Sequence, residues 1–185
     1  MNKVERLIRN YERHVALPWD DALSGPQRVW FAVYDKADER RLRAHVGDFE
    51  VATKGAGKGW RLCDLTDAFP EWMGGKEYRE SYFESPEDLE IALGDFLRFA
   101  AGRVTDHLGA DHHKDEVVAI LGVATLFGFA RVSDLARAVQ PSVRGRLLVF
   151  FPGEYENNSY RLLDARDGWN YLAVPITHHE RTLTA

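Results

Sequence analysis

The spacing of hydrophobic positions along the chain alternates between the pattern of strands and the pattern of helices. Short β-rich runs occur at residues 29–34, 60–65, 117–121 and 147–151, and the last of these has no polar break. A strand with apolar residues on both faces must be covered on both faces, so residues 147–151 predict the centre of a covered sheet. The segment 170–176 predicts a fifth strand at an edge of that sheet.

Helical spacing appears between these runs. The apolar residues from Val4 to Val15 recur at intervals of three and four, which predicts an amphipathic helix; residues 1–26 comprise this helix and a connector. Asp35 stands in a good position to cap the helix that follows the first strand. Further helices are predicted at residues 36–53, 66–72, 85–108 and 132–139.

Strands that alternate with helices indicate an α/β fold. A length of 185 residues suggests one domain, so we expect residues 1–185 to form a single α/β domain. Its sheet should be mostly parallel, with about five strands and helices on both faces, either Rossmann-like or similar to a degenerate P-loop fold. Residues 177–185 are expected to be a flexible tail.

The last third of the chain contains several turn signals. Pro152-Gly153 should end the central strand, because proline cannot donate to a strand ladder and glycine permits an unusual turn. Residues 154–158 then predict a polar loop. Asp167-Gly168 predicts a hairpin or tight turn between the short apolar segments 160–163 and 171–176.

Composition and charge narrow the class of protein. The formal net charge is −5, which argues against a general nucleic-acid or membrane binder but leaves a local basic patch possible. The single cysteine, Cys63, excludes an internal disulfide and a cysteine-rich metal cage. Residues 1–10 lack the apolar core of a signal peptide, and no apolar run approaches the ~20 residues that cross a bilayer. We therefore expect a cytoplasmic protein with no membrane partner and no direct DNA binding.

Two glycine-rich segments raise the question of a nucleotide site. Residues 54–59 lie in the order helix, loop, strand, which is the reverse of a phosphate loop, so they predict a helix end and a connector. Residues 122–128 follow a strand as a phosphate loop does, but they contain no lysine and are mostly bulky and apolar. No functional Walker A motif is expected at either place.

Acidic residues and histidines raise the question of a metal or catalytic site. His107, His112 and His113 lie near Asp111 and Asp115, but the spacing matches no ligand motif and predicts a polar loop. Several side chains could converge at the carboxyl ends of the strands, although helix caps and a surface turn are the simpler interpretation. No catalytic residue, metal ligand or cofactor is therefore predicted, and the chain is not expected to be an enzyme. The residues at the strand ends are Asp35, Asp64, Asp67, Gly122, Thr125, Glu154, Tyr155, Asn157 and Asn158.

Aromatic residues and arginines flank the polar segment of the last third, and tyrosine, tryptophan and arginine are the residue types enriched at protein interfaces. Some of these rings must belong to the core, because tyrosine and tryptophan are usually half-buried. The sequence nevertheless predicts a partner-binding surface here. Its candidate residues are Glu154, Tyr155, Asn157, Asn158, Tyr160, Arg161, Arg166, Trp169 and Tyr171.

The segments FFPGEYENN at residues 150–158, YRLLD at 160–164 and DGWNYLAVPI at 167–176 resemble the C-terminal signature of the BrxB family. Residues 118–135 and 27–31 are also similar to that family. BrxB proteins are small components of BREX bacteriophage-exclusion systems, in which host DNA is modified and phage replication is blocked.

The resemblance implies a non-enzymatic assembly or scaffold subunit. It implies PglZ, the alkaline-phosphatase-like component, as a direct partner, with the DNA methyltransferase and the large ATPase of the same systems as further partners. The alternative hypothesis is a nucleotide- or metal-binding enzyme or sensor with a degenerate phosphate site at residues 122–128.

Overall fold

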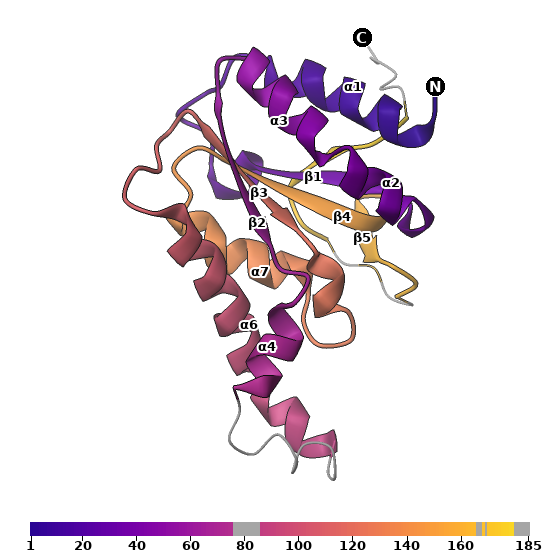
Figure 1. Ribbon diagram of the computed structural model, residues 1–185, viewed down its shortest axis with the longest axis vertical. Helices are drawn as coiled ribbons and strands as arrows, with labels where there is room; N and C mark the ends of the chain where they lie inside the picture. Colours follow the sequence, from indigo (N-terminus) through magenta and orange to yellow (C-terminus); the bar gives the residue numbers. More distant parts are fainter. Residues whose placement is uncertain (76–85, 166–167, 169, 180–185) are drawn as a thin grey trace.

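The computed structural model describes residues 1–75, 86–165, 168 and 170–179. Within these residues, six strands form one sheet in the order β2-β3-β4-β1-β6, in which all neighbours run parallel, and β5 pairs antiparallel with β4 (Figure 1). This confirms the predicted mostly parallel α/β fold, with one strand more than the five expected. The strands are β1 (Val29–Tyr34), β2 (Gly59–Asp64), β3 (Glu116–Leu121), β4 (Arg146–Glu156), β5 (Ser159–Leu162) and β6 (Val174–Ile176).

Helices cover both faces of the sheet, as predicted. On one face lie α1 (Lys3–Val15), α2 (Glu39–Ala44) and α3 (Val46–Gly55), at the top of Figure 1. On the other lie α4 (Ala68–Gly74), α6 (Pro86–Leu108) and α7 (Val132–Val139). Short 3-10 helices occupy connections at η1 (Gly25–Arg28), η2 (Lys36–Asp38), η3 (Val123–Leu126) and η4 (Gln140–Ser142).

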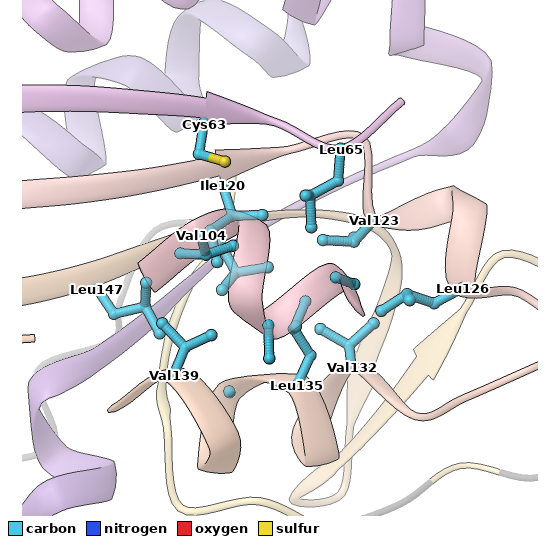
Figure 2. Packing of buried hydrophobic residues seen from close by; sticks show 14 of the residues in the cluster. Cys63, Leu65, Val104, Ile120, Val123, Leu126, Val132, Leu135, Val139 and Leu147 are labelled. Atoms are coloured by element: carbon cyan, nitrogen blue, oxygen red, sulfur yellow. The ribbon is translucent and has the colours of Figure 1, made fainter. Parts of the chain in front are cut away.

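The two cores follow from the period of two in the central strands. In β4, Leu148 and Phe150 point into the core under α1 and α3, while Leu147, Val149 and Phe151 point into the core over α6 and α7. The residues of β1 divide in the same way. Figure 2 shows how aliphatic side chains from β3, β4, α6 and α7 fill the second core. The residues labelled there are Cys63, Leu65, Val104, Ile120, Val123, Leu126, Val132, Leu135, Val139 and Leu147.

The connector between α1 and β1 is attached to the sheet by a buried arginine. Arg146, the first residue of β4, is 2% exposed, and its guanidinium donates to the carbonyl oxygen of Asp20 at 3.0 Å. The same group lies over the ring of Trp19, 4.8 Å from its centroid. Burial lowers the pKa of Arg146 below that of a free arginine. Backbone oxygens and a ring face thus bind this charge, which stabilises the connector against the amino end of the sheet.

The expected end of the central strand at Pro152-Gly153 is wrong. β4 continues to Glu156, because it changes partner at Pro152. Pro152 is opposite the last residue of β1, and from Gly153 onward β4 pairs with β5. The carbonyl oxygen of Pro152 accepts a hydrogen bond from the N–H of Leu163 at 2.9 Å. The missing proline N–H therefore falls where one ladder ends and the next begins, and it does not interrupt the strand.

The turn of the β4–β5 hairpin lies at Asn157-Asn158, within the predicted polar loop. Both asparagines have left-handed φ angles, 51° and 61°, which is the geometry of a two-residue turn that suits the twist of paired strands. β5 and β6 do not pair with each other, because β6 lies parallel to β1 at the edge of the sheet. Asp167 is outside the described residues. β6 covers Val174–Ile176, which is shorter than the predicted 170–176.

The predicted helix at residues 36–53 is divided into η2, α2 and α3. The chain leaves helical geometry at His45, with φ −110° and ψ 9°, and the His45 ring then contacts Asp48 in the first turn of α3 at 2.7 Å. The predicted cap is confirmed, since the carboxylate of Asp35 accepts from the N–H of Ala37 at 3.0 Å. The predicted connector at residues 54–59 is also confirmed, because α3 ends at Gly55 and β2 begins at Gly59.

Phe150→Ala should destabilise the fold strongly. Phe150 is fully buried in the centre of the sheet and packs edge-on against Phe49 at 4.9 Å. Removing the ring leaves a cavity, and we expect a loss of about 3–5 kcal/mol in the free energy of unfolding, measured by urea titration. Phe127→Ala is the matched control, because Phe127 is 42% exposed and should lose less than about 1 kcal/mol. Equal losses would contradict the assignment of β4 as the buried centre.

Candidate functional site

A cleft of about 480 Å³ opens at the carboxyl edge of the sheet. One wall is the extension of β4 from Gly153 to Glu156, and the other includes Asp35 and Lys36 at the end of β1. Lys3 of α1 and the segment after β6, residues 177–179, complete the lining. Segments that are far apart in the sequence thus meet beside the β4–β5 hairpin.

The position of the cleft follows from the topology of the sheet. After β1 the chain crosses to the face covered by α2 and α3, whereas after β4 it turns into β5, whose Tyr160 and Leu162 belong to the opposite core. Adjacent strands whose connections leave toward opposite faces open a crevice outside their carboxyl ends, and ligands of open α/β sheets bind there. The cleft therefore lies where this fold class places its sites.

Four charged side chains of the cleft form two ion pairs with one another. Lys3 pairs with Asp35 at 3.5 Å, and Lys36 pairs with Asp164. The hydrogen bond from Ala37, together with the nearby lysines, lowers the pKa of Asp35, so this carboxylate is ionised at neutral pH. Among the described residues, no group of three potential ligands could hold a metal ion.

His178 and His179 form the outer end of the cleft. Their rings lie 4.0 Å apart, and the Asn10 side chain donates to the carbonyl oxygens of Thr177 and His179 at 2.7 and 3.1 Å. These bonds attach residues 177–179 to α1, so this part of the predicted flexible tail is held in place. Burial and nearby positive charge lower the pKa of His178, which favours its neutral form.

The acids at the strand ends do not converge on one point. Asp35 follows β1, while Asp64 ends β2, three positions away in the sheet and thus about 14 Å distant at the usual spacing of strands. Asp64 accepts from the N–H of Thr66 at 2.9 Å and pairs with Arg43 at 3.5 Å. Asp67 occupies the first position before α4, but its side chain makes no capping hydrogen bond.

The candidate phosphate loop at residues 122–128 is closely packed at its start. Gly122 has a φ of +85°, and a Cβ built there would lie 2.5 Å from the backbone nitrogen of Thr66. η3 follows with only four residues, and its Val123 and Leu126 are buried in the core. A phosphate site needs exposed N–H groups at the start of a helix. In this loop, Thr125 already donates to the carbonyl oxygen of Gly122 at 3.2 Å, which does not favour the phosphate-site alternative.

Gly122→Ala should cost more stability than Gly128→Ala. Both glycines have left-handed φ angles, +85° and +79°, but a Cβ at Gly128 would meet nothing within 4 Å. The shared backbone penalty is about 1–2 kcal/mol. The close approach to Thr66 should add about 1–3 kcal/mol at Gly122 only. Chemical denaturation of both variants measures the difference, and equal losses would mean that the loop is open.

The histidine-rich segment contains a buried hydrogen-bond network that the polar-loop prediction missed. His112 is 5% exposed, and its Nε2 accepts from the N–H of Arg144 at 2.9 Å. The ring proton therefore lies on Nδ1, which donates to Glu116 at 2.7 Å. Arg61 of β2 donates to the same carboxylate at 2.7 Å and to Asp111 at 3.1 Å. This network joins β2, β3 and the start of β4, which is a structural role; no sequence motif marks it.

Acid should weaken the fold through Glu116. Burial raises the pKa of Glu116, but the hydrogen bonds from Arg61 and His112 and the positive charge of Arg61 outweigh burial and lower it overall. A lowered folded pKa means that the stabilisation is complete above the ordinary pKa of glutamate, about 4.3, and is lost as pH falls through the folded value. Urea unfolding of Glu116→Gln should show a shallower loss of stability below about pH 4.3. Glu12→Gln, at an exposed glutamate, should retain the wild-type slope; a wild-type slope in Glu116→Gln would contradict this prediction.

The structure distributes the predicted interface residues between surface and core. Glu154, Asn157, Asn158 and Arg161 are exposed on the hairpin, and Tyr155 is half-buried. Glu154 and Arg161 lie directly opposite each other on β4 and β5. The described part of the hairpin thus presents mainly polar and charged groups.

Tyr160 and Tyr171, two of the predicted contact residues, lie in the core of the structure. Tyr160 is fully buried and donates to the carbonyl oxygen of Ala173 at 2.8 Å, and Tyr171 is 7% exposed. Their burial leaves almost no side-chain surface for a partner. Arg166 and Trp169 lie outside the described residues.

Comparison with known proteins identifies the family. The fold and the site define an α/β protein with a doubly covered parallel sheet and a hairpin beside an edge cleft. The family model for BREX protein BrxB matches residues 81–176, which is more than half of the chain and includes the whole hairpin. The chain belongs to the BrxB family and is a component of BREX phage defence. Neither the curated proteins nor the solved structures include a match. In the described part of the chain, no helix has the length and apolar character to span a membrane.

Proposed function

We propose that this protein is a non-enzymatic assembly subunit of a BREX complex, which binds the PglZ-type component through the β4–β5 hairpin and the cleft beside it. In this role it supports modification of host DNA and restriction of phage. The observation that carries the proposal is the hairpin itself, a polar extension of the central strand β4 that projects beyond its parallel neighbours. Membership of the BrxB family supports a partner from the same system.

Contacts within the protein hold the hairpin in place without a partner. Tyr160 anchors it to the core, and the ring of Tyr155 packs on that of Tyr160 with centroids 4.7 Å apart. The Tyr155 hydroxyl donates to Asn158 at 3.1 Å across the turn. A surface held in one conformation loses little entropy on binding, so such a hairpin suits specific recognition. Tyr160 and Tyr171 therefore serve the proposed interface as supports.

The exposed part of the hairpin supplies polar and charged groups for recognition. Glu154, Asn157, Asn158 and Arg161 project from it, and the cleft beside it can accept a segment of the partner. Arg166 and Trp169 remain proposed contacts. A stable protein interface covers about 800 Å² on each partner, which is more than one short hairpin provides. The proposed surface therefore includes the walls of the cleft.

Exchange of the two charges that face each other on the hairpin tests the proposal. The double variant Glu154→Arg/Arg161→Glu keeps opposite charges facing each other across the two strands. It reverses the sign of the charge that each position presents to a partner. Co-purification of PglZ with the tagged protein at moderate salt should fall about tenfold or more, since reversed charges across an interface cost several kcal/mol. The melting temperature should change little. Phage plating efficiency in cells with the complete BREX set should rise in parallel.

The matched control exchanges the pair Glu50 and Lys54 on α3, which are joined at 2.6 Å far from the hairpin. Glu50→Lys/Lys54→Glu should retain PglZ as the wild type does. Wild-type protein that retains no PglZ would refute the proposed partner. Undiminished retention by the hairpin variant would refute the proposed surface.

A further inference from the structure

The outer face of α1 has a row of arginines that form no ion pair with the part of the chain that the structure describes. Arg6, Arg9 and Arg13 are exposed, and none makes an ion pair with any residue in the described ranges. Their spacing of three and four residues places them on one side of the helix, opposite the buried stripe of Val4 to Val15. Other arginines, such as Arg43 and Arg61, do pair with acids. Within residues 1–75, 86–165, 168 and 170–179, the α1 row is thus positive charge without an ion-pair partner, on a chain with a net charge of −5.

The row borders a hollow that the fold itself holds open. Arg6, Arg9 and Arg13 line a depression of about 250 Å³ together with Asn10 and His178. Asn10 attaches the segment after β6 to α1 through its bonds to the carbonyl oxygens of Thr177 and His179. Burial lowers the pKa of His178, and the neighbouring charges, among them Lys3 and Arg6, lower it further.

We propose that the arginine row of α1, defined by Arg6, Arg9 and Arg13, binds an acidic segment of the protein partner that docks on the hairpin. The planar guanidinium binds a carboxylate through two parallel hydrogen bonds, and three of them in a row fit a segment with repeated aspartate or glutamate. The inference rests on the proposed function for the identity of the partner. It adds that the partner presents acidic side chains to the outer face of α1.

Continuity with the cleft supports one partner for both surfaces. His178 lines both the hollow and the cleft, and Lys3, which lines the cleft, lies on the same helix as the arginine row. The cleft and the hollow thus meet at His178, and one partner seated on the hairpin is placed to contact both. Together these regions provide an area closer to that of a stable interface than the hairpin alone.

The dimensions of the row favour a protein over duplex nucleic acid. From Arg6 to Arg13 the helix rises only about 10 Å. The exposed Glu5 and Glu12 lie on the same helix, where they limit the positive strip to a narrow band. Tight duplex binding takes about 6–10 phosphate contacts, and three arginines supply too few. A positive strip of this length is sufficient to bind a short acidic peptide segment.

The triple variant Arg6→Gln/Arg9→Gln/Arg13→Gln tests the inference. Two probes are titrated at low salt: a fluorescein-labelled 12-residue peptide with glutamate at every third or fourth position, and a labelled 20-base-pair DNA duplex. Wild-type protein should bind the peptide, and the triple variant should bind it at least about tenfold more weakly, which corresponds to 1.4 kcal/mol. The PglZ retained on the tagged triple variant should fall as well.

The matched control is Arg40→Gln/Arg131→Gln/Arg144→Gln, which removes the same charge from three exposed arginines on other elements. It should bind the peptide within about twofold of the wild type, because only general charge is altered. Equal peptide binding by the wild type and the α1 variant would overturn the inference. Duplex DNA bound more tightly than the peptide, and lost in the α1 variant, would overturn it in favour of nucleic acid.

The two proposals fail in different ways. If the wild type retains no PglZ but its arginine row still selects the acidic peptide, the proposed partner is wrong and the chemistry of the row stands. If the hairpin variant loses PglZ while the α1 variant keeps it, the hairpin surface stands and the arginine row is not part of it.

Discussion

Burial of β4 on both faces is the constraint on which the rest of the structure depends. Leu147 to Phe151 have no exposed side chain, and neighbouring residues along this strand point into different cores. One core requires α1 and α3, and the other requires α6 and α7. Because apolar burial is the main favourable term in folding, the layers form together around this strand. In the sheet, β4 lies at the centre, between β3 and β1.

The candidate site is a consequence of the length of that strand. β4 has eleven residues, whereas β1 and β3 beside it have six each. The excess pairs with β5 and forms the hairpin, and the space between the hairpin and the end of β1 becomes the cleft. A rigid core therefore extends directly into the surface that is proposed to meet a partner, and Tyr160 connects the two.

Charged side chains differ in whether they have partners within the protein. Paired charges stabilise the fold, whereas unpaired surface charges are available for recognition. Buried ionic groups are paired or bonded to the backbone, as in the Arg61–Glu116–His112 network, because an uncompensated buried charge is costly. On the surface, Lys3 and Asp35 satisfy each other within the cleft. The arginine row of α1 differs from both, since it remains unpaired within the described residues. Exposed charge without an internal partner is available for an external one.

The sequence by itself determined the elements whose signal is local. The apolar runs predicted β1, β3 and the core of β4, the helical stripe predicted α1, and the cap at Asp35 was placed correctly, because these features depend on spacing and neighbouring residues. Family membership was also visible in the residues that became β4, β5 and β6. Tertiary structure alone decided that Pro152 lies between two ladders and that Asn157-Asn158 forms the turn. It likewise decided that Tyr160 is core, that His112 bonds Glu116, and that the end of the chain joins α1 beside the arginine row. Each of these depends on contacts between segments distant in the sequence, and the local spacing of residues does not predict such contacts.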